Sequence, residues 1–167
     1  MSAAFRIAPL AAAHDRDGFC CGSPPLDRYL RELAGQDVKR RVSNCFVAID
    51  PAGVIAGYYT FAATSLPLTE LPEDIARRLP RYAAMPAGLI GRLAVARNVQ
   101  GCGLGGALVM DAALRASRSD TAIYALIVEA KDDVAAAFYE RLQFRRFASR
   151  ARALFLPLAT ALQAMEK

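Results

Sequence analysis

The chain has 167 residues, of which 54% are apolar and 22% are charged, and it contains no Trp. That length supports a single domain over residues 1–167 with its own core, and the composition excludes a disordered tail or a fibrous repeat. No apolar run reaches the roughly 18 residues that a membrane span needs, and the N-terminus lacks a signal-peptide pattern. We therefore expect a cytoplasmic protein without membrane contact.

The net charge of +5 is unevenly distributed. Residues 1–140 hold 15 Lys and Arg against 15 Asp and Glu, whereas residues 141–167 hold 6 against 1. The basic residues are 18 Arg and only 3 Lys. Arginine suits phosphate recognition, but a GC-rich genome gives the same bias, so the charge alone does not identify a partner.

The first part of the chain predicts a strand, a helix and a hairpin. Residues 5–10 form the expected strand, and residues 24–35 the helix, with Ser23 as its cap and Gly35 at its end. In that helix one face is expected to carry Leu26, Leu30 and Leu33. The next two strands, 44–50 and 54–66, flank a turn containing Gly53 and indicate a β-hairpin.

The second part of the chain predicts alternating strands and helices. A proline-rich surface excursion over 67–88, with a helical stretch around 73–79, returns to the core at Leu89. Strands are then expected at 88–95, 122–130, 144–148 and 152–156, and helices at 104–118, 132–142 and 157–165. This order indicates a mixed α/β sheet with helices on its faces.

The four cysteines do not form a metal or disulfide framework. Cys20 and Cys21 are adjacent, and Cys45, Cys102 and the single histidine, His14, add no ligand spacing of a zinc site. We expect no bound metal and a reducing compartment.

A glycine-rich segment follows the strand that ends at Gly91-Arg92-Leu93-Ala94-Val95. It reads Gln100-Gly101-Cys102-Gly103-Leu104-Gly105-Gly106 and opens a helix whose apolar face is Leu104, Leu108 and Ala112. Glycines let the backbone approach a ligand closely, and free N–H groups at a helix start favour phosphate. A tight strand–helix turn would give the same pattern. The segment lacks the Lys-Ser/Thr pair of a Walker A loop, and its position in the middle of the chain differs from that of a dinucleotide-binding unit.

Two motifs together resemble the GNAT acyltransferases. The first is Gln100-x-x-Gly103-x-Gly105 after a strand, and the second is the segment from Asp132 to Phe144, which contains Phe138-Tyr139-Glu140-Arg141-Leu142. The resemblance implies a mostly antiparallel sheet, splayed at an acetyl-CoA site. Gln143 stands where the family usually has Gly, so this turn is expected to hold a non-Gly residue at an unusual backbone angle. Asp132 stands where the family often has Asn.

Further segments resemble the GNAT toxins of type II toxin–antitoxin modules, the TacT-like group. They are Phe19-x-Cys21-Gly22-x-x-x-Leu26-Asp27-x-Tyr29-Leu30, Gly57-Tyr58-Tyr59-Thr60, Leu79-Pro80-Arg81-Tyr82, Gly91–Val95 and Phe155-Leu156-Pro157-Leu158. Such toxins acetylate the α-amino group of aminoacyl-tRNA and so block translation. The resemblance implies a ribbon-helix-helix antitoxin and a homodimer. Alternatives are an acetyltransferase of a small amine or a protein N-terminus, and a CoA-binding subunit of a DNA-bound regulatory complex.

The resemblance also assigns roles to residues. Tyr139 would be the general acid, donating to the departing CoA thiolate. Acetyl-CoA would contact Leu93, Ala94, Val95, Gln100, Gly101, Cys102, Gly103, Leu104, Gly105, Gly106, Asp132, Ala135 and Phe138. We expect direct transfer without a Cys102 nucleophile, because no His or acid is placed in sequence to activate that thiol.

The sequence leaves the general base open, with Glu129 or a water relay as candidates. An α-amine has a pKa of about 8 and a lysine amine about 10.4, so an α-amine needs less help to attack. For tRNA phosphates the candidates are Lys39, Arg40, Arg77, Arg78 and Arg92. The arginines of 145–152 would bind a second tRNA region, a dimer mate or an acidic antitoxin segment.

Overall fold

The computed structural model describes residues 4–166. The chain forms two compact units: unit 1 takes residues up to Ala62 together with Gly91–Ala112, and unit 2 takes Ala63–Ile90 together with the chain from Ala113. Strands β3 (Ile55–Pro67) and β4 (Ala84–Val95) and helix α4 (Leu104–Arg118) run through both units. The sheet has the strand order β1-β2-β3-β4-β5-β7-β6. Its described pairings are antiparallel except for β4 with β5, which confirms the mixed, mostly antiparallel α/β fold.

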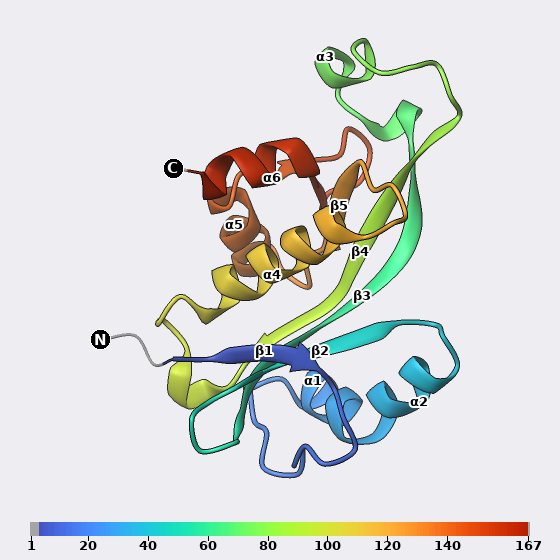
Figure 1. Ribbon diagram of the computed structural model, residues 1–167. Coiled ribbons are helices and arrows are strands. Elements are labelled where there is room, and N and C mark those ends of the chain that lie inside the picture. Colours follow the sequence, from blue (N-terminus) through green and yellow to red (C-terminus); the bar gives the residue numbers. More distant parts are fainter. Residues whose placement is uncertain (1–3, 167) are drawn as a thin grey trace. The chain divides into compact units, whose positions relative to one another are not determined.

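The remaining elements follow the predicted order (Figure 1). In unit 1 they are β1 (Arg6–Pro9), α1 (Pro24–Arg28), a π-helical turn (Tyr29–Leu33), α2 (Ala34–Lys39), β2 (Asn44–Ile49) and a 3₁₀ turn (Arg97–Val99). In unit 2 they are a 3₁₀ turn (Leu68–Glu70), α3 (Glu73–Ala76), β5 (Ala125–Glu129), α5 (Asp133–Arg141), β6 (Arg145–Arg146), β7 (Ala153–Pro157) and α6 (Leu158–Met165).

The prediction of one regular helix over 24–35 was wrong in its middle and at its end. At the π-helical turn the N–H of Ala34 donates to the carbonyl of Tyr29, which adds a residue to that turn. The insertion rotates the following residues, so Leu30 is fully buried while Leu33 is 40% exposed. The helical segment then continues past Gly35 to Lys39.

The start of this helical segment also differs from the prediction. Ser23 occupies the cap position, but its side chain makes no capping hydrogen bond. Its backbone carbonyl accepts the N–H groups of Leu26 and Asp27, both at 3.1 Å. The buried Asp27 carboxylate accepts the N–H of Cys21 at 2.9 Å and so fixes the preceding loop.

Unit 1 has a core of its own between the helical segment and the sheet. Tyr29, Leu30 and Ala34 pack with Val47 and Tyr58, all of them buried. The hairpin prediction is confirmed: β2 and β3 pair antiparallel, from Asn44 opposite Phe61 to Ile49 opposite Ile55.

Unit 2 has a second core around β5 and β7. Phe155 and Phe147 pack with Leu66, Leu71 and Met85. The proline-rich excursion is therefore only partly a surface feature, because Leu71 is 4% exposed and β4 begins at Ala84 rather than at Gly88. Strands β4 and β5 pair from Ala87 opposite Ala125 to Ile90 opposite Val128.

Candidate functional site

The end of β4 in unit 1 is held very close to β3. A Cβ on Gly57 would lie 2.9 Å from the carbonyl oxygen of Ala94, so only glycine allows this approach. The N–H of Arg92 donates to the side-chain Oγ1 of Thr60 at 3.0 Å. The side chains of Leu93 and Val95 are half-buried and that of Ala94 is buried, so a ligand at this strand would meet mainly the backbone of these residues.

The glycine-rich segment bends through two left-handed residues before α4. Gly101 has φ +85° and Gly103 has φ +90°, a conformation that L side chains rarely adopt. A Cβ at either position would meet no heavy atom within 4 Å, so these glycines face open space. Leu104 and Leu108 are buried as predicted, and they orient the first turn of α4 with Gly105 and Gly106 in it. The arrangement presents backbone N–H groups at the positive end of a helix, which suits a pyrophosphate.

Two side chains of this segment have local partners. The Gln100 amide donates to the carbonyls of Val95 and Cys21, both at 2.9 Å, and ties the loop to the end of β4. The exposed Cys102 directs its Sγ to the carbonyl of Val99 at 2.8 Å. Gln100 therefore fixes the shape of the loop relative to the end of β4.

Arg92 is supported by residues that the sequence did not identify as functional. Its guanidinium lies over the ring of Tyr29, 3.7 Å from the centroid, and the Tyr29 hydroxyl donates to Asp37 at 2.7 Å. Burial, the hydrogen bond to Asp37 and the Asp37 charge raise the pKa of Tyr29, so the ring stays neutral beneath the cation. This stack presents the exposed Arg92 in a fixed orientation. A tyrosine eight residues before an acid gives no recognisable sequence signal.

In unit 2, Tyr139 lies in helix α5 between two other aromatic rings. Its ring meets those of Phe138 and Phe144 edge-on, with centroids 5.0 and 5.4 Å away. Tyr139 is 7% exposed, and burial raises its pKa to about 12. No hydrogen bond of its hydroxyl is found within residues 4–166. No buried side-chain oxygen or nitrogen of these residues lacks a partner, so the hydroxyl oxygen reaches solvent, and the neutral phenol can donate to a ligand there.

The two ends of α5 differ in how they are stabilised. Asp132 is the N-cap, and its carboxylate accepts the N–H of Ala135 at 2.8 Å. At the other end the carbonyl of Tyr139 accepts the N–H groups of Leu142 and Phe144. Gln143 between them has φ +75°, which confirms the prediction of a non-Gly residue at an unusual angle.

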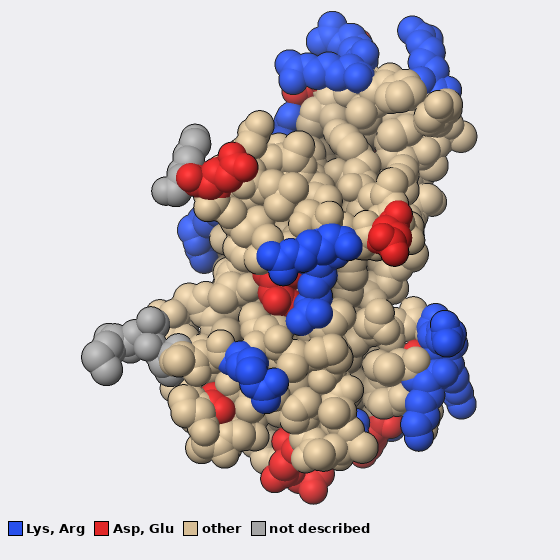
Figure 2. Space-filling model, viewed as in Figure 1, with Lys and Arg blue, Asp and Glu red and all other residues tan. Residues whose placement is uncertain are grey.

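The structure thus divides the predicted site residues between the two units. Unit 1 brings together Arg92–Val95 and Gln100–Gly106, and it also holds Lys39 and Arg40 at the end of α2. Unit 2 places Asp132, Ala135, Phe138 and Tyr139 on α5, and Arg77 and Arg78 directly after α3. Figure 2 shows Lys and Arg side chains gathered over the part of unit 2 that carries α3, and over the end of α2 in unit 1.

The arginines of the C-terminal segment have partners inside unit 2. Arg145 pairs with Asp74, Arg146 with Glu140, and Arg152 with Asp133. Arg150 pairs with Glu70 at 2.8 Å and with Glu129 at 3.6 Å. Glu129, a candidate general base, is therefore already engaged by a cation.

No three His, Cys, Asp or Glu side chains gather within residues 4–166 as a metal ion would require. No helix in this part of the chain is both long enough and apolar enough to cross a bilayer.

Comparisons with known proteins confirm the resemblance that the sequence motifs indicate. Residues 41–146 match the acetyltransferase (GNAT) domain family. The chain is 36% identical over 137 residues to a tRNA-acetylating toxin of Mycobacterium tuberculosis, covering 81% of each chain.

Two solved structures of AtaT are also similar to this chain over nearly its whole length. AtaT complexed with acetyl-methionyl-tRNAfMet has 27% identity and a TM-score of 0.88, with 98% of this chain and 100% of that chain covered. A tyrosine-to-phenylalanine mutant of AtaT, bound to the C-terminus of the antitoxin AtaR and to acetyl-CoA, has 25% identity and a TM-score of 0.81 over 98% of this chain and 99% of that chain.

Proposed function

Because the chain belongs to the GNAT acetyltransferase family, we propose that it moves acetyl from acetyl-CoA to the α-amino group of aminoacyl-tRNA. The tRNA-acetylating relative and the AtaT complex with an acetylated aminoacyl-tRNA support this acceptor. The observation in this chain that carries the proposal is the buried Tyr139, whose neutral hydroxyl is free to donate. Acetylation of the α-amine removes the nucleophile of peptide-bond formation, so the activity blocks translation.

The glycine-rich loop holds the pyrophosphate of acetyl-CoA in this proposal. The left-handed Gly101 and Gly103 and the start of α4 supply N–H groups, with open space where side chains would stand. The backbone of Leu93, Ala94 and Val95 contacts the pantetheine arm. Asp132, Ala135 and Phe138 on α5 complete the set of residues assigned to acetyl-CoA.

Transfer forms the amide C–N bond, breaks the thioester C–S bond and leaves CoA as a thiol. Tyr139 donates a hydrogen bond to the sulfur as negative charge develops there. A phenol with a pKa of about 12 keeps its proton against a thiolate of pKa about 8.5, so Tyr139 stabilises charge chiefly as a hydrogen-bond donor. The proton that ends on the thiol is supplied by the amine, which loses one on acylation.

The tRNA backbone is held by basic side chains in both units. Arg92, fixed on the Tyr29 ring, and Lys39 and Arg40 contribute from unit 1, and Arg77 and Arg78 from unit 2. Arginines of this kind position phosphates without reading sequence.

The partners follow from the same proposal. We assign the protein to the cytoplasm, where charged tRNA and acetyl-CoA are found, and we expect a homodimer neutralised by a ribbon-helix-helix antitoxin. Binding of the AtaR C-terminus to AtaT supports neutralisation by a segment of such a partner.

A cell-free translation extract tests the proposal. The purified protein should stop translation when acetyl-CoA is present and leave it unaffected after the extract is depleted of acetyl-CoA. Inhibition that persists without acetyl-CoA would contradict an acetyl-transfer mechanism. Acetylation of free amines without any effect on translation would indicate an acetyltransferase of small amines instead.

A further inference from the structure

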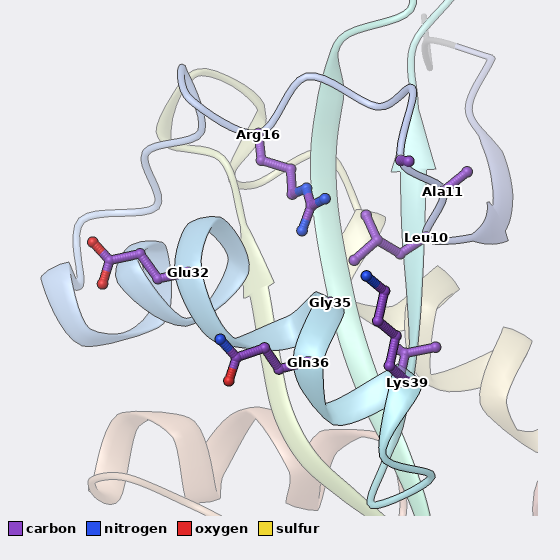
Figure 3. A pocket seen from close by; sticks show the side chains of 9 residues that line it. Leu10, Ala11, Arg16, Glu32, Gly35, Gln36 and Lys39 are labelled. Carbon is purple, nitrogen blue, oxygen red and sulfur yellow. The ribbon is translucent and has the colours of Figure 1, made fainter.

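Unit 1 contains a hollow that the acetyl-CoA residues do not use. It has a volume of about 330 Å³ and lies between the segment after β1 and helix α2 (Figure 3). Its walls are formed by Leu10, Ala11, Ala12, Arg16, Glu32, Gly35, Gln36, Val38 and Lys39. Among these residues only Lys39 has a role in the proposed function.

Two cations face this hollow without a counter-ion. Figure 3 shows the side chains of Arg16 and Lys39 extending toward one another from opposite walls. Neither side chain forms an ion pair or a hydrogen bond within residues 4–166. Glu32 is the acid of the wall, but it turns away and pairs with Arg28 at 2.7 Å. An anion between Arg16 and Lys39 would replace like-charge repulsion by two attractions.

Gly35 gives Arg16 its place in the wall. A Cβ on Gly35 would lie 3.3 Å from Nη1 of Arg16, tighter than an ordinary contact. Glycine within a helix costs about 1 kcal/mol relative to alanine. Room for the guanidinium is thus a physical reason for glycine at this helical position.

The rest of the wall is apolar. Leu10 and Val38 are half-buried and pack on the core of unit 1, and Ala11 and Ala12 are small and exposed. A nucleic-acid phosphate would use only the two cations, whereas an acidic residue beside an aliphatic one would use the cations and the apolar wall together. The lining therefore favours a peptide over RNA.

We propose that this hollow docks an acidic, aliphatic peptide segment of the antitoxin, with a carboxylate between Arg16 and Lys39. The inference rests on the proposed function, and the AtaT complex with the C-terminus of its antitoxin supports a segment as the occupant. Lys39 is also assigned to tRNA. A segment docked here removes that phosphate contact, so docking and tRNA binding compete.

A library of random 12-residue peptides displayed on phage tests the docking site on the full chain. Selected peptides should carry Asp or Glu within two positions of Leu, Ile, Val or Phe. Their affinity should fall at least tenfold for the double variant Arg16→Gln/Lys39→Gln, and several-fold for Gly35→Ala, which displaces the guanidinium. Arg31→Gln is the matched control, because Arg31 is exposed on the same helical segment but does not line the hollow. It should leave the affinity unchanged.

Three results would overturn the docking site. They are selected peptides without acidic residues, equal binding to the double variant and the parent, and a loss of affinity in Arg31→Gln as large as in the double variant. If no peptide is selected and a short single-stranded RNA binds in a way that depends on Arg16, the hollow is an RNA site. That result would also reject the proposal. The selection contains neither tRNA nor acetyl-CoA. Absent tRNA acetylation with peptide binding intact would therefore contradict the proposed function and leave the docking site standing.

Discussion

Arg145 forms a bidentate ion pair with Asp74: Nη1 of the arginine lies 3.1 Å from Oδ2 of the carboxylate, and Nη2 lies 3.3 Å from Oδ1. Arg150 pairs with Glu70, whose carbonyl also accepts the N–H of Ala148 at 3.1 Å. These contacts attach the segment around α3 to the turn between β6 and β7 inside unit 2. Two of the basic residues of 141–167, Arg145 and Arg150, thus hold the segment that presents Arg77 and Arg78.

Replacing Asp74 by Asn tests whether the Arg145–Asp74 pair affects tRNA binding by holding the α3 segment or only through the charge of Asp74. The change removes a negative charge, so electrostatics alone predicts tighter binding of tRNA. We expect two- to fivefold weaker binding, because losing this exposed pair loosens the segment carrying Arg77 and Arg78. Fluorescence anisotropy with labelled tRNA at fixed salt measures the change. The charge-swapped double variant Asp74→Arg/Arg145→Asp is the control and should restore the affinity, and tighter binding by Asp74→Asn would refute the holding role.

Replacing Tyr139 by Phe tests its role in transfer. Phenylalanine keeps the edge-on packing with Phe138 and Phe144 but removes the hydroxyl, so kcat should fall about 100-fold with little change in KM for acetyl-CoA. Tyr124→Phe removes a half-buried hydroxyl from the same unit and serves as the control, with kcat unchanged. Steady-state kinetics with labelled acetyl-CoA measures both. Full activity of Tyr139→Phe would exclude the tyrosine from the reaction.

The raised pKa of Tyr139 makes the alkaline side of the pH profile informative. A donor must be protonated, and a pKa of about 12 moves its loss of function well above the ordinary value of about 10. The rate should therefore rise with pH as the α-amine deprotonates near pH 8, and then stay level to pH 10. Initial rates of kcat/KM, corrected for uncatalysed ester hydrolysis, test this. An alkaline fall with an apparent pKa near 10 that Tyr139→Phe abolishes would contradict the burial argument.

The glycine-rich loop can be tested with a matched pair of variants. Gly103 has φ +90° and Gly53, in the β2–β3 turn, has φ +86°, and a Cβ at either meets no atom within 4 Å. Alanine at each position should lower the free energy of unfolding by a similar ~1 kcal/mol, because the backbone strain is the same. Only Gly103→Ala should raise KM for acetyl-CoA, by about tenfold. Equal KM values for the two variants would remove Gly103 from the pyrophosphate site.

Much of this fold could be predicted because local signals agreed with the tertiary structure. Helix α4 begins and ends where its glycine start and apolar face indicate, over Leu104–Arg118. The unusual backbone angle of Gln143 could be predicted because this residue stands where the family usually has Gly. Its φ of +75° follows from the turn that closes α5. The π-helical turn at Tyr29–Leu33 could not be predicted, because nothing in the local periodicity marks an added residue.

The site could be predicted where glycines mark an unusual backbone conformation. It could not be predicted where two side chains that are far apart in the sequence come into contact. Arg92 on Tyr29 and Arg145 on Asp74 join residues 63 and 71 positions apart, and no local pattern connects them. Arg16 in the hollow had no sequence signal, because a lone arginine in a polar loop resembles any solvated charge. The single domain over residues 1–167 stays a prediction.

Acetyl transfer from labelled acetyl-CoA to charged and deacylated tRNA decides whether the chain acetylates the α-amine of aminoacyl-tRNA. We expect label on the charged tRNA alone, recovered as an N-acetylated amino acid after the ester is hydrolysed. Equal labelling of both tRNAs, or of neither, would contradict this expectation.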